Sequence, residues 1–278
     1  MPPFPNLVSE SVLVSDAIRY LQAVGGSASA VRIVDRVMKI RRPEPSLARL
    51  LVADLVEQDS RLSIYDDLVE LADNRHDHLE LEHADFVVFD VETTGAKAPP
   101  CRITEIGAYR VRNGKITEEF QTLLNPGMPI PPFIIALTGI DDAMVAGAAK
   151  FEEVADELMR FIGDSVLVAH NAPFDLGFLN YEIGRVYKDY RLGNPSLCTV
   201  QLSRGMISEI ENHKLKTVAN YYSIDLVNHH RAGDDAHATA RILVNLLKEM
   251  NTAGVTTLGS ARRLKRKKPY ARERTNAA

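Results

Sequence analysis

An apolar segment that ends in two carboxylates constrains the fold of this chain more than any other feature. Residues 86–92 read Phe-Val-Val-Phe-Asp-Val-Glu, a pattern that predicts a buried strand. Side chains alternate between the two faces of a strand, so Asp90 and Glu92 point to the same side. Two neighbouring acids at the end of an apolar strand are electrostatically costly unless a cation compensates them. The segment therefore predicts a metal site at one end of a sheet.

The next two segments predict further strands of the same sheet. Residues 102–112 and 115–124 are strand-like and flank Asn113-Gly114, which is the strongest short signal for a hairpin. We therefore expect the first three strands to form an antiparallel meander. An amphipathic helix is predicted over 151–162.

A third carboxylate follows a short buried strand predicted over 166–169. The chain leaves this strand through His170-Asn-Ala-Pro-Phe-Asp175 and enters another helix. Pro173 suits the first turn of that helix, which places Asp175 early in it. The alternation of strand and helix here predicts an α/β fold with a mixed sheet.

The last helix is predicted over 233–250, with Asp235 in its first turn and His230 on the loop before it. A metal ligand needs rigid support, such as a helix. A general base can lie on a loop, because its contact with the substrate can tighten when the substrate binds. An imidazole with a pKa near 6.5 is suited to deprotonating water near neutral pH. Together the segments supply four carboxylates and one imidazole, enough to hold two divalent cations and move one proton.

These residues resemble a known family. The segments Asp90–Gly95, His170–Asp175 and His230–Asp235 resemble the three exonuclease motifs of the DEDDh 3'-to-5' exonucleases, which include RNase T and the proofreading epsilon subunit of DNA polymerase III. Leu137-Thr-Gly-Ile140 is similar to a segment between the first two motifs. The resemblance covers residues 84–250 and implies a ribonuclease H-like fold, 3'-5' exonuclease activity and two Mg2+ or Mn2+ ions.

The resemblance also assigns roles to individual positions. Its spacing selects Asp235 over Asp234, and His230 over His229. By position, the metal ligands are Asp90, Glu92, Asp175 and Asp235, the base is His230, and the residues that hold the terminal nucleotide are Thr94, Leu137, Asn171 and Phe174. It implies that water attacks the last phosphodiester and that a 5'-mononucleotide leaves.

The N-terminal part predicts a separate domain. Helices are predicted over 16–24, 29–38 and 43–57, and a strand over 61–65. Three helices followed by a strand resemble a winged-helix domain, which we place at 11–72, after a flexible segment over 1–10 and before a polar linker over 73–83.

The charge of this N-terminal part does not favour a DNA-binding domain. Residues 1–84 contain nine Lys or Arg and fourteen Asp or Glu. A DNA-binding winged helix is expected to be basic, so a module for protein binding or dimerisation is at least as good an interpretation. Both alternatives stay open, and one of them is contact with a polymerase or another protein partner.

The C-terminal segment over 251–278 is basic and is expected to be disordered. Residues 262–274 contain eight Lys or Arg and one Glu. Such a tail gives sequence-independent affinity for nucleic acid, although it could also serve only solubility. The two cysteines, Cys101 and Cys198, fit reduced packing positions, and no segment predicts secretion or a membrane span, so we expect a cytoplasmic protein with no membrane partner.

Three functions remain for comparison. The first is a two-metal 3'-5' exonuclease acting on DNA with a free, single-stranded 3' end, in proofreading or repair. The second is a nucleic-acid-binding adaptor that uses the winged helix and the basic tail. The third keeps the catalysis but makes RNA the substrate, because nothing in the motifs detects a 2'-hydroxyl group.

Overall fold

The computed structural model describes residues 2–72 and 76–266, which form two compact units. The first unit contains residues 2–72 together with 155–164 and 180–194, and the second contains the remaining described residues. In the described part of the chain, no helix has both the length and the apolar character needed to cross a membrane.

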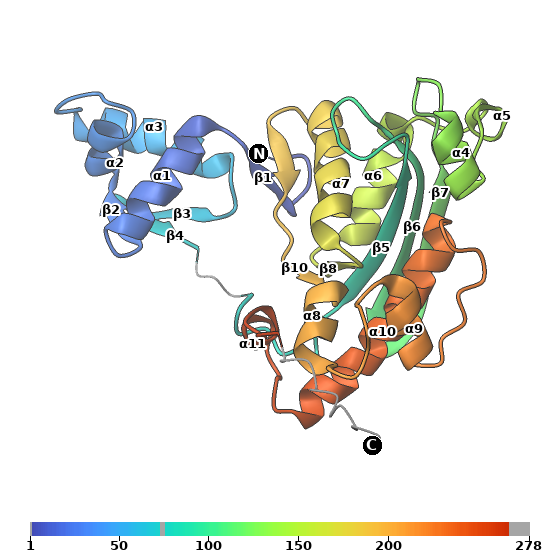
Figure 1. Cartoon of the computed structure of the whole chain (residues 1–278). Helices are drawn as coiled ribbons and strands as arrows, with labels where there is room; N and C mark the ends of the chain where they lie inside the picture. Colours follow the sequence, from blue (N-terminus) through green and yellow to red (C-terminus); the bar gives the residue numbers. More distant parts are fainter. Residues whose placement is uncertain (1, 73–75, 267–278) are drawn as a thin grey trace, which may run out of the picture. The chain divides into compact units, whose positions relative to one another are not determined.

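A five-stranded mixed sheet forms the centre of the second unit (Figure 1). Its strand order is β10-β8-β5-β6-β7, in which β5, β6 and β7 are antiparallel neighbours and β8 runs parallel to both β5 and β10. The predicted mixed sheet with its antiparallel meander is confirmed. The strands are β5 (Phe86–Thr93), β6 (Ile103–Arg112), β7 (Lys115–Leu123), β8 (Val166–Ala169) and β10 (Ser196–Cys198).

The hairpin between β6 and β7 follows directly from its two turn residues. Asn113 and Gly114 have φ angles of 49° and 69°, so both lie in the left-handed region. A two-residue turn of this kind matches the right-handed twist of the flanking strands, and Asn-Gly is the pair that adopts it most readily. The turn therefore aligns β6 with β7. Strand β5 lies in the interior of the sheet because it pairs with both β6 and β8.

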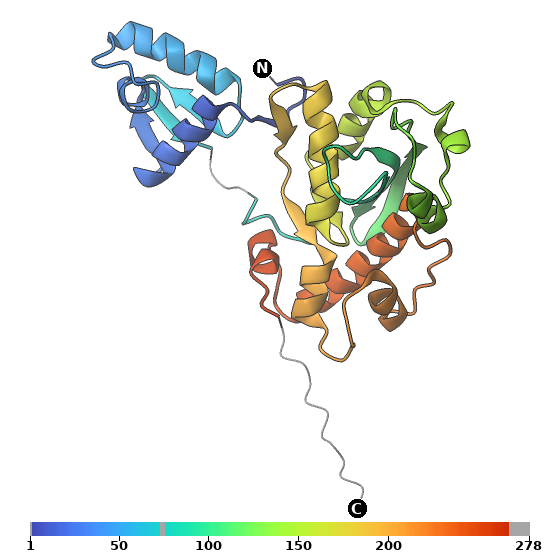
Figure 2. The ribbon, with the colours of Figure 1, turned by 45° about the horizontal axis from the view of Figure 1, so that its top comes forward.

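Helix α10 (Ala232–Thr252) packs across β5 and β6, and α8 (Thr199–Met206) and α9 (Leu215–Tyr221) pack against α10 (Figure 1, Figure 2). Its inward side chains Ile242, Leu243 and Leu246 are fully buried. Because this apolar face fixes the helix on the sheet, the first turn of α10 is held at the end of β5. The other helices with residues in this unit are α4 (Pro132–Thr138), α5 (Asp142–Val145), α6 (Phe151–Ile162), α7 (Ala172–Val186) and α11 (Leu258–Arg262).

The predicted linker and tail are wrong over part of their length. The N–H of Leu81 donates to the carbonyl of Thr256, and the N–H of Leu258 donates to the carbonyl of Leu79. Leu81 and Leu258 are buried, and Thr257 caps α11. These few apolar residues pair two segments far apart in sequence, which a local charge count does not detect. Residues 73–75 and 267–278, to which the linker and tail predictions also extend, lie outside the described residues.

The first unit contains the three predicted helices and a three-stranded antiparallel sheet in the order β2-β4-β3. The buried faces of the helices and of the sheet form one apolar core, with Leu21, Ile33 and Val52 completely inaccessible to solvent. The winged-helix assignment stays a prediction. The elements are α1 (Val12–Ala23), β2 (Ser27–Ser29), α2 (Ala30–Arg36), α3 (Pro45–Glu57), β3 (Leu62–Tyr65) and β4 (Leu68–Leu71).

The predicted flexible N-terminus is wrong for its last residues. Strand β1 (Leu7–Ser9) pairs in antiparallel fashion with β9 (Tyr190–Leu192) in the same unit. Leu7 and Val8 are 0% and 4% exposed. The partner strand lies some 180 residues further along the chain, as the pairing of Leu7 with Leu192 shows, so a three-residue strand could not be recognised from its local sequence.

Candidate active site

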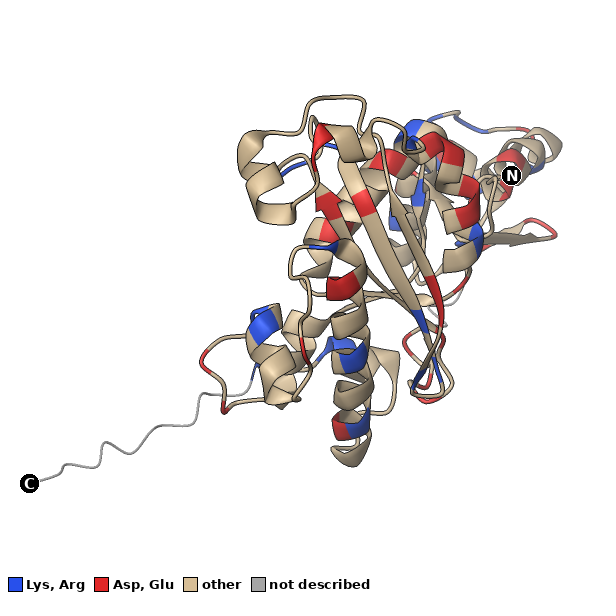
Figure 3. Ribbon diagram, turned by 90° about the vertical axis from the view of Figure 1, so that its right-hand side faces the viewer, with Lys and Arg blue, Asp and Glu red and all other residues tan. Residues whose placement is uncertain are grey.

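Three carboxylates meet where β5 ends beside the first turn of α10. The alternation of β5 places Asp90 and Glu92 on one face of the sheet, and α10 places Asp235 against that face. Carboxylate oxygens of these three residues lie within 4.8 Å of one another. Figure 3 shows acidic positions on the strands close to acidic positions on a neighbouring helix, together with further acidic positions elsewhere on the strands and helices.

The fourth predicted acid, Asp175, reaches the same place from the first turn of α7. It is 3% exposed, and its Oδ1 accepts the N–H of Val91 at 3.3 Å. Asp175 lines the same pocket as Asp90, Glu92 and Asp235. The structure thus brings together all four acids that the sequence singled out.

The acids raise one another's affinity for protons. Burial raises the pKa of Asp90 well above its usual value, and the charges of Asp175, Glu92 and Asp235 add to this effect. Burial and nearby carboxylates raise the pKa of Glu92 to about 8, and burial raises that of Asp175 to about 7. These carboxylates are costly to ionise without a compensating positive charge. Divalent cations prefer oxygen ligands and supply that charge, so the cluster is suited to binding them.

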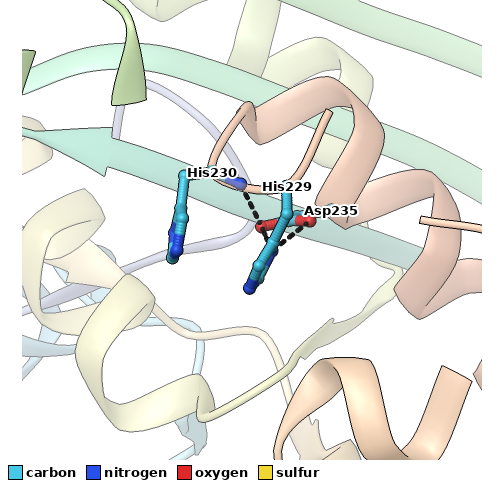
Figure 4. Close-up of side chains that lie close together, drawn as sticks. All are labelled: His229, His230 and Asp235. Carbon is cyan, nitrogen blue, oxygen red and sulfur yellow. Dashed lines mark hydrogen bonds and ion pairs between the residues drawn. The ribbon is translucent and has the colours of Figure 1, made fainter. Parts of the chain in front are cut away.

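Two histidines, His229 and His230, lie beside Asp235 (Figure 4). Nδ1 of His229 lies 3.1 Å and 3.0 Å from the two carboxylate oxygens of Asp235, and the backbone N–H of His230 donates to Oδ2 of Asp235 at 3.1 Å. The two imidazole rings stack with their centroids 3.9 Å apart. His230 adopts a φ of 70°, a left-handed conformation that turns the chain sharply before α10.

The environment of His230 favours its neutral form. Burial lowers the pKa of His230, and proximity to His229 lowers it further, while Asp235 acts in the opposite direction. No hydrogen bond joins the His230 ring to another described residue. A neutral ring with a free nitrogen can accept a proton. In His229 the contact with Asp235 occupies Nδ1 and leaves only Nε2 for that role.

Apolar side chains form one wall of the pocket, whose volume is about 460 Å³. Leu137 of α4 and Phe174 of α7, both predicted to hold the substrate, line this wall. Thr94 and Asn171 are not among the lining residues. Thr94 is 2% exposed, and its hydroxyl accepts the N–H of Arg102 at 3.0 Å, so it supports the turn after β5.

Sequence reasoning missed other pocket residues. Phe133 of α4 lines the pocket and is 69% exposed, yet nothing in Pro-Pro-Phe distinguishes it from an ordinary helix start. His170 also lines the pocket, with its ring held between the Thr199 hydroxyl at 2.9 Å and the His213 carbonyl at 3.0 Å. Burial lowers the pKa of His170 to about 4, so this ring is a neutral, fixed wall.

Comparison with known proteins agrees with this geometry. The family model of the RNase T type, described as an exonuclease, matches residues 87–243, which span β5 to the middle of α10 and contain all four acids and both histidines. The chain belongs to the RNase T exonuclease family. It is a 3'-to-5' exonuclease, and therefore a phosphodiester hydrolase, with the ribonuclease H-like fold of that family.

Among curated proteins, the chain is similar to DNA polymerase III of the PolC type. It is 43% identical over 190 residues to the enzyme of Halalkalibacterium halodurans and 38% identical over 215 residues to that of Bacillus subtilis. These matches cover 67% and 75% of this chain but only 13% and 15% of the two polymerases. The chain thus spans a small part of the length of these relatives.

Solved structures show the same fold. Exonuclease X in complex with 5' overhanging duplex DNA matches with a TM-score of 0.51 and 29% identity, over 64% of this chain and 98% of that one. Escherichia coli exonuclease I in complex with a dT13 oligonucleotide matches with a TM-score of 0.54 and 15% identity, over 62% and 42% of the two chains.

Proposed function

We propose that this exonuclease uses two divalent cations, Mg2+ or Mn2+, to remove 5'-mononucleotides from the single-stranded 3' end of DNA. The catalytic domain is placed at residues 84–250, and the winged-helix domain at 11–72. The convergence of the oxygens of Asp90, Glu92 and Asp235 within 4.8 Å, with Asp175 lining the same pocket, is the observation that supports the proposal most strongly.

The acidic cluster defines where the cations would bind. The ligands are Asp90, Glu92, Asp175 and Asp235. Because these carboxylates are buried and repel one another, bound cations would stabilise their ionised form. When bound, a pair of divalent cations supplies an activated water and stabilises charge on the attacking and leaving oxygens.

The proton of the attacking water is accepted by His230 in this proposal. Its ring lines the pocket, has a lowered pKa and carries no hydrogen bond to another described residue. His229 keeps Asp235 oriented through Nδ1. We assign the base role to His230 and an orienting role to His229.

The apolar wall of the pocket would hold the terminal nucleotide. Leu137 and Phe133 are half or more exposed although they line the pocket, and Phe174 of α7 lines the same pocket. Bases stack on such apolar and aromatic surfaces without strong sequence preference. A single unpaired end presents its bases for this contact, whereas a paired end does not.

A direct assay tests the proposal. An oligonucleotide labelled at its 5' end should shorten one nucleotide at a time from the other end in Mg2+ or Mn2+, and the product should be a 5'-mononucleotide. EDTA and the variant Asp90→Asn should stop the reaction. Stable binding without shortening would instead favour the adaptor function, and faster shortening of a matched RNA would make the enzyme an exoribonuclease.

The polymerase relatives support a replication role for the exonuclease. PolC-type DNA polymerase III contains a region similar to most of this chain. We therefore propose that the enzyme edits DNA ends, alone or beside a polymerase bound through its N-terminal domain. Faster removal of a mispaired 3' nucleotide than of a paired one is the expected result, and equal rates would contradict an editing role.

A further inference from the structure

A fifth acid, Glu105, lies next to the four carboxylates of the proposed metal site. Glu105 is the direct cross-strand partner of Glu92 in the β5–β6 ladder and is 1% exposed. A buried carboxylate is stable only when its charge is paired and its oxygens accept hydrogen bonds. The partners of Glu105 therefore indicate what it does.

Both oxygens of Glu105 are engaged by the chain that joins His230 to α10. Nε and Nη2 of Arg231 lie 3.1 Å and 2.8 Å from Oε2 and Oε1, in a bidentate pair. The backbone N–H of Ala232 donates to Oε2 at 2.9 Å, and Nε2 of Gln121 donates to Oε1 at 3.3 Å. With four donors on two oxygens, Glu105 has little capacity left to bind a cation.

The backbone of the same junction lies directly against the sheet. A Cβ atom at Gly107 would lie 2.4 Å from the backbone of Ala232, and one at Gly233 would lie 2.4 Å from the side chain of Gln121. The junction between His230 and α10 is thus held by an ion pair, by a hydrogen bond and by close packing. His230, with its left-handed φ of 70°, immediately precedes this fixed point.

We propose that Glu105 and Arg231 are positioning residues that hold the His229–His230 loop over the metal-binding carboxylates, and that Glu105 is not a metal ligand. This inference rests on the proposed function of the loop. The position of the His230 imidazole matters because displacement of a reacting group by about 1 Å can reduce a rate about 100-fold. The Arg231 cation also lies close enough to Glu92 to lower the pKa of that acid.

The variants Glu105→Gln and Arg231→Lys test the geometry. Glu105→Gln places an amide N–H2 group opposite a donor, and Arg231→Lys keeps the charge but loses the bidentate contact. We expect each to lower kcat about 10- to 100-fold, with KM for the oligonucleotide and the Mn2+ concentration at half activity within about twofold of wild type. Wild-type kcat in both variants would overturn the proposal, and so would a loss that excess Mn2+ restores.

Glu182→Gln is the matched control. Glu182 is 1% exposed and pairs with Arg185 at 3.1 Å, and neither residue lines the pocket. We expect this variant to keep the wild-type kcat even if its melting temperature falls as much as that of Glu105→Gln. A similar loss of kcat in Glu182→Gln would show that the effect is general destabilisation, and it would overturn the positioning role.

Hydrogen exchange provides a readout that does not require activity. In metal-free protein, Glu105→Gln should accelerate amide exchange over residues 228–234 at least about tenfold, while exchange in the rest of α10 stays as in wild type. Unchanged exchange over 228–234 would overturn the inference. If wild-type protein cleaved no nucleic acid, the proposed function would fail, and the exchange experiment would still decide whether Glu105 and Arg231 hold the loop.

Discussion

Nδ1 of His229 lies 3.0 Å from Oδ2 of Asp235. The histidine next to His230, the assigned base, is thus hydrogen-bonded to an assigned metal ligand. This contact gives the two adjacent histidines different chemical environments. The His229 ring is oriented by the Asp235 carboxylate. The His230 ring is stacked on the His229 ring and makes no hydrogen bond to a described residue.

His230→Ala is expected to lower kcat by about 100- to 10,000-fold, because a general base contributes about that much to a rate. His229→Ala should lower kcat by about tenfold or less, because the backbone N–H of His230 still bonds Asp235 when the His229 contact is lost. Single-turnover cleavage of a labelled oligonucleotide measures both. A deeper loss in His229→Ala than in His230→Ala would reverse the two assigned roles.

The metal-free protein should become less stable as the pH rises. The pKa of Glu92 is raised from 4.5 to about 8, and that of Asp175 from 3.8 to about 7. The folded state therefore holds these protons more tightly than the unfolded state, so their stabilising contribution is complete below the unfolded values and disappears as the pH rises through the folded values. Melting temperatures in EDTA from about pH 4 to about pH 9 measure this, and Glu92→Gln should flatten the decline.

Added Mn2+ or Mg2+ should reverse that loss of stability. Protons and cations compete for the same oxygens, so the increase in melting temperature on adding metal should be larger at about pH 8 than at about pH 6. At a metal concentration of about 100 times Kd, the stabilisation is expected to be about 2.7 kcal/mol. Asp90→Asn with Asp235→Asn should abolish the shift, and an unchanged shift in this double variant would place the cations elsewhere.

Phe133→Ala should weaken DNA binding more than it slows chemistry. Stacking of one base on an aromatic ring contributes about 1–3 kcal/mol, which corresponds to a 5- to 150-fold increase in KM or Kd, with kcat nearly unchanged. Fluorescence anisotropy with a short oligonucleotide in Ca2+ measures the affinity. Tyr221→Ala is the matched control, because Tyr221 is a 43% exposed aromatic residue of α9 that does not line the pocket. Equal affinity in wild type and Phe133→Ala would remove Phe133 from the substrate site.

Leu7→Ala should destabilise the first unit although the sequence around it predicts a flexible end. Leu7 is fully buried in β1, and loss of such a side chain costs about 2–5 kcal/mol. Urea denaturation measures the change. Val12→Ala removes an apolar side chain that is 73% exposed and should cost less than about 0.5 kcal/mol. A similar small effect for both variants would contradict the role of β1.

The local sequence predicts those parts of the fold in which a strong pattern coincides with the final environment. The hairpin at Asn113-Gly114 is determined by two residues that tolerate left-handed backbone, and the acids of β5 share a face because strand side chains alternate. The convergence of Asp175 and Asp235 with β5 needed the family resemblance, because helix starts carry no information about which strand they will lie beside.

The parts that sequence reasoning missed depend on pairing between distant segments. Strand β1 is three residues long and exists because β9 offers it an edge. The segment around Leu81 looks polar, yet it pairs with the residues before α11. The partners of Glu105 belong to the same class, because nothing between positions 105 and 231 indicates that the two side chains meet.

The pairing of β1 with β9 also limits how this protein can be divided. The family match begins at residue 87, which suggests that the nuclease could be separated by one cut ahead of that point. Such a cut would remove Leu7–Ser9 and leave the backbone donors and acceptors of Tyr190–Leu192 unpaired. An open strand edge invites association with other chains. A truncated or transplanted nuclease would therefore need either those early residues or a substitute strand to stay monodisperse.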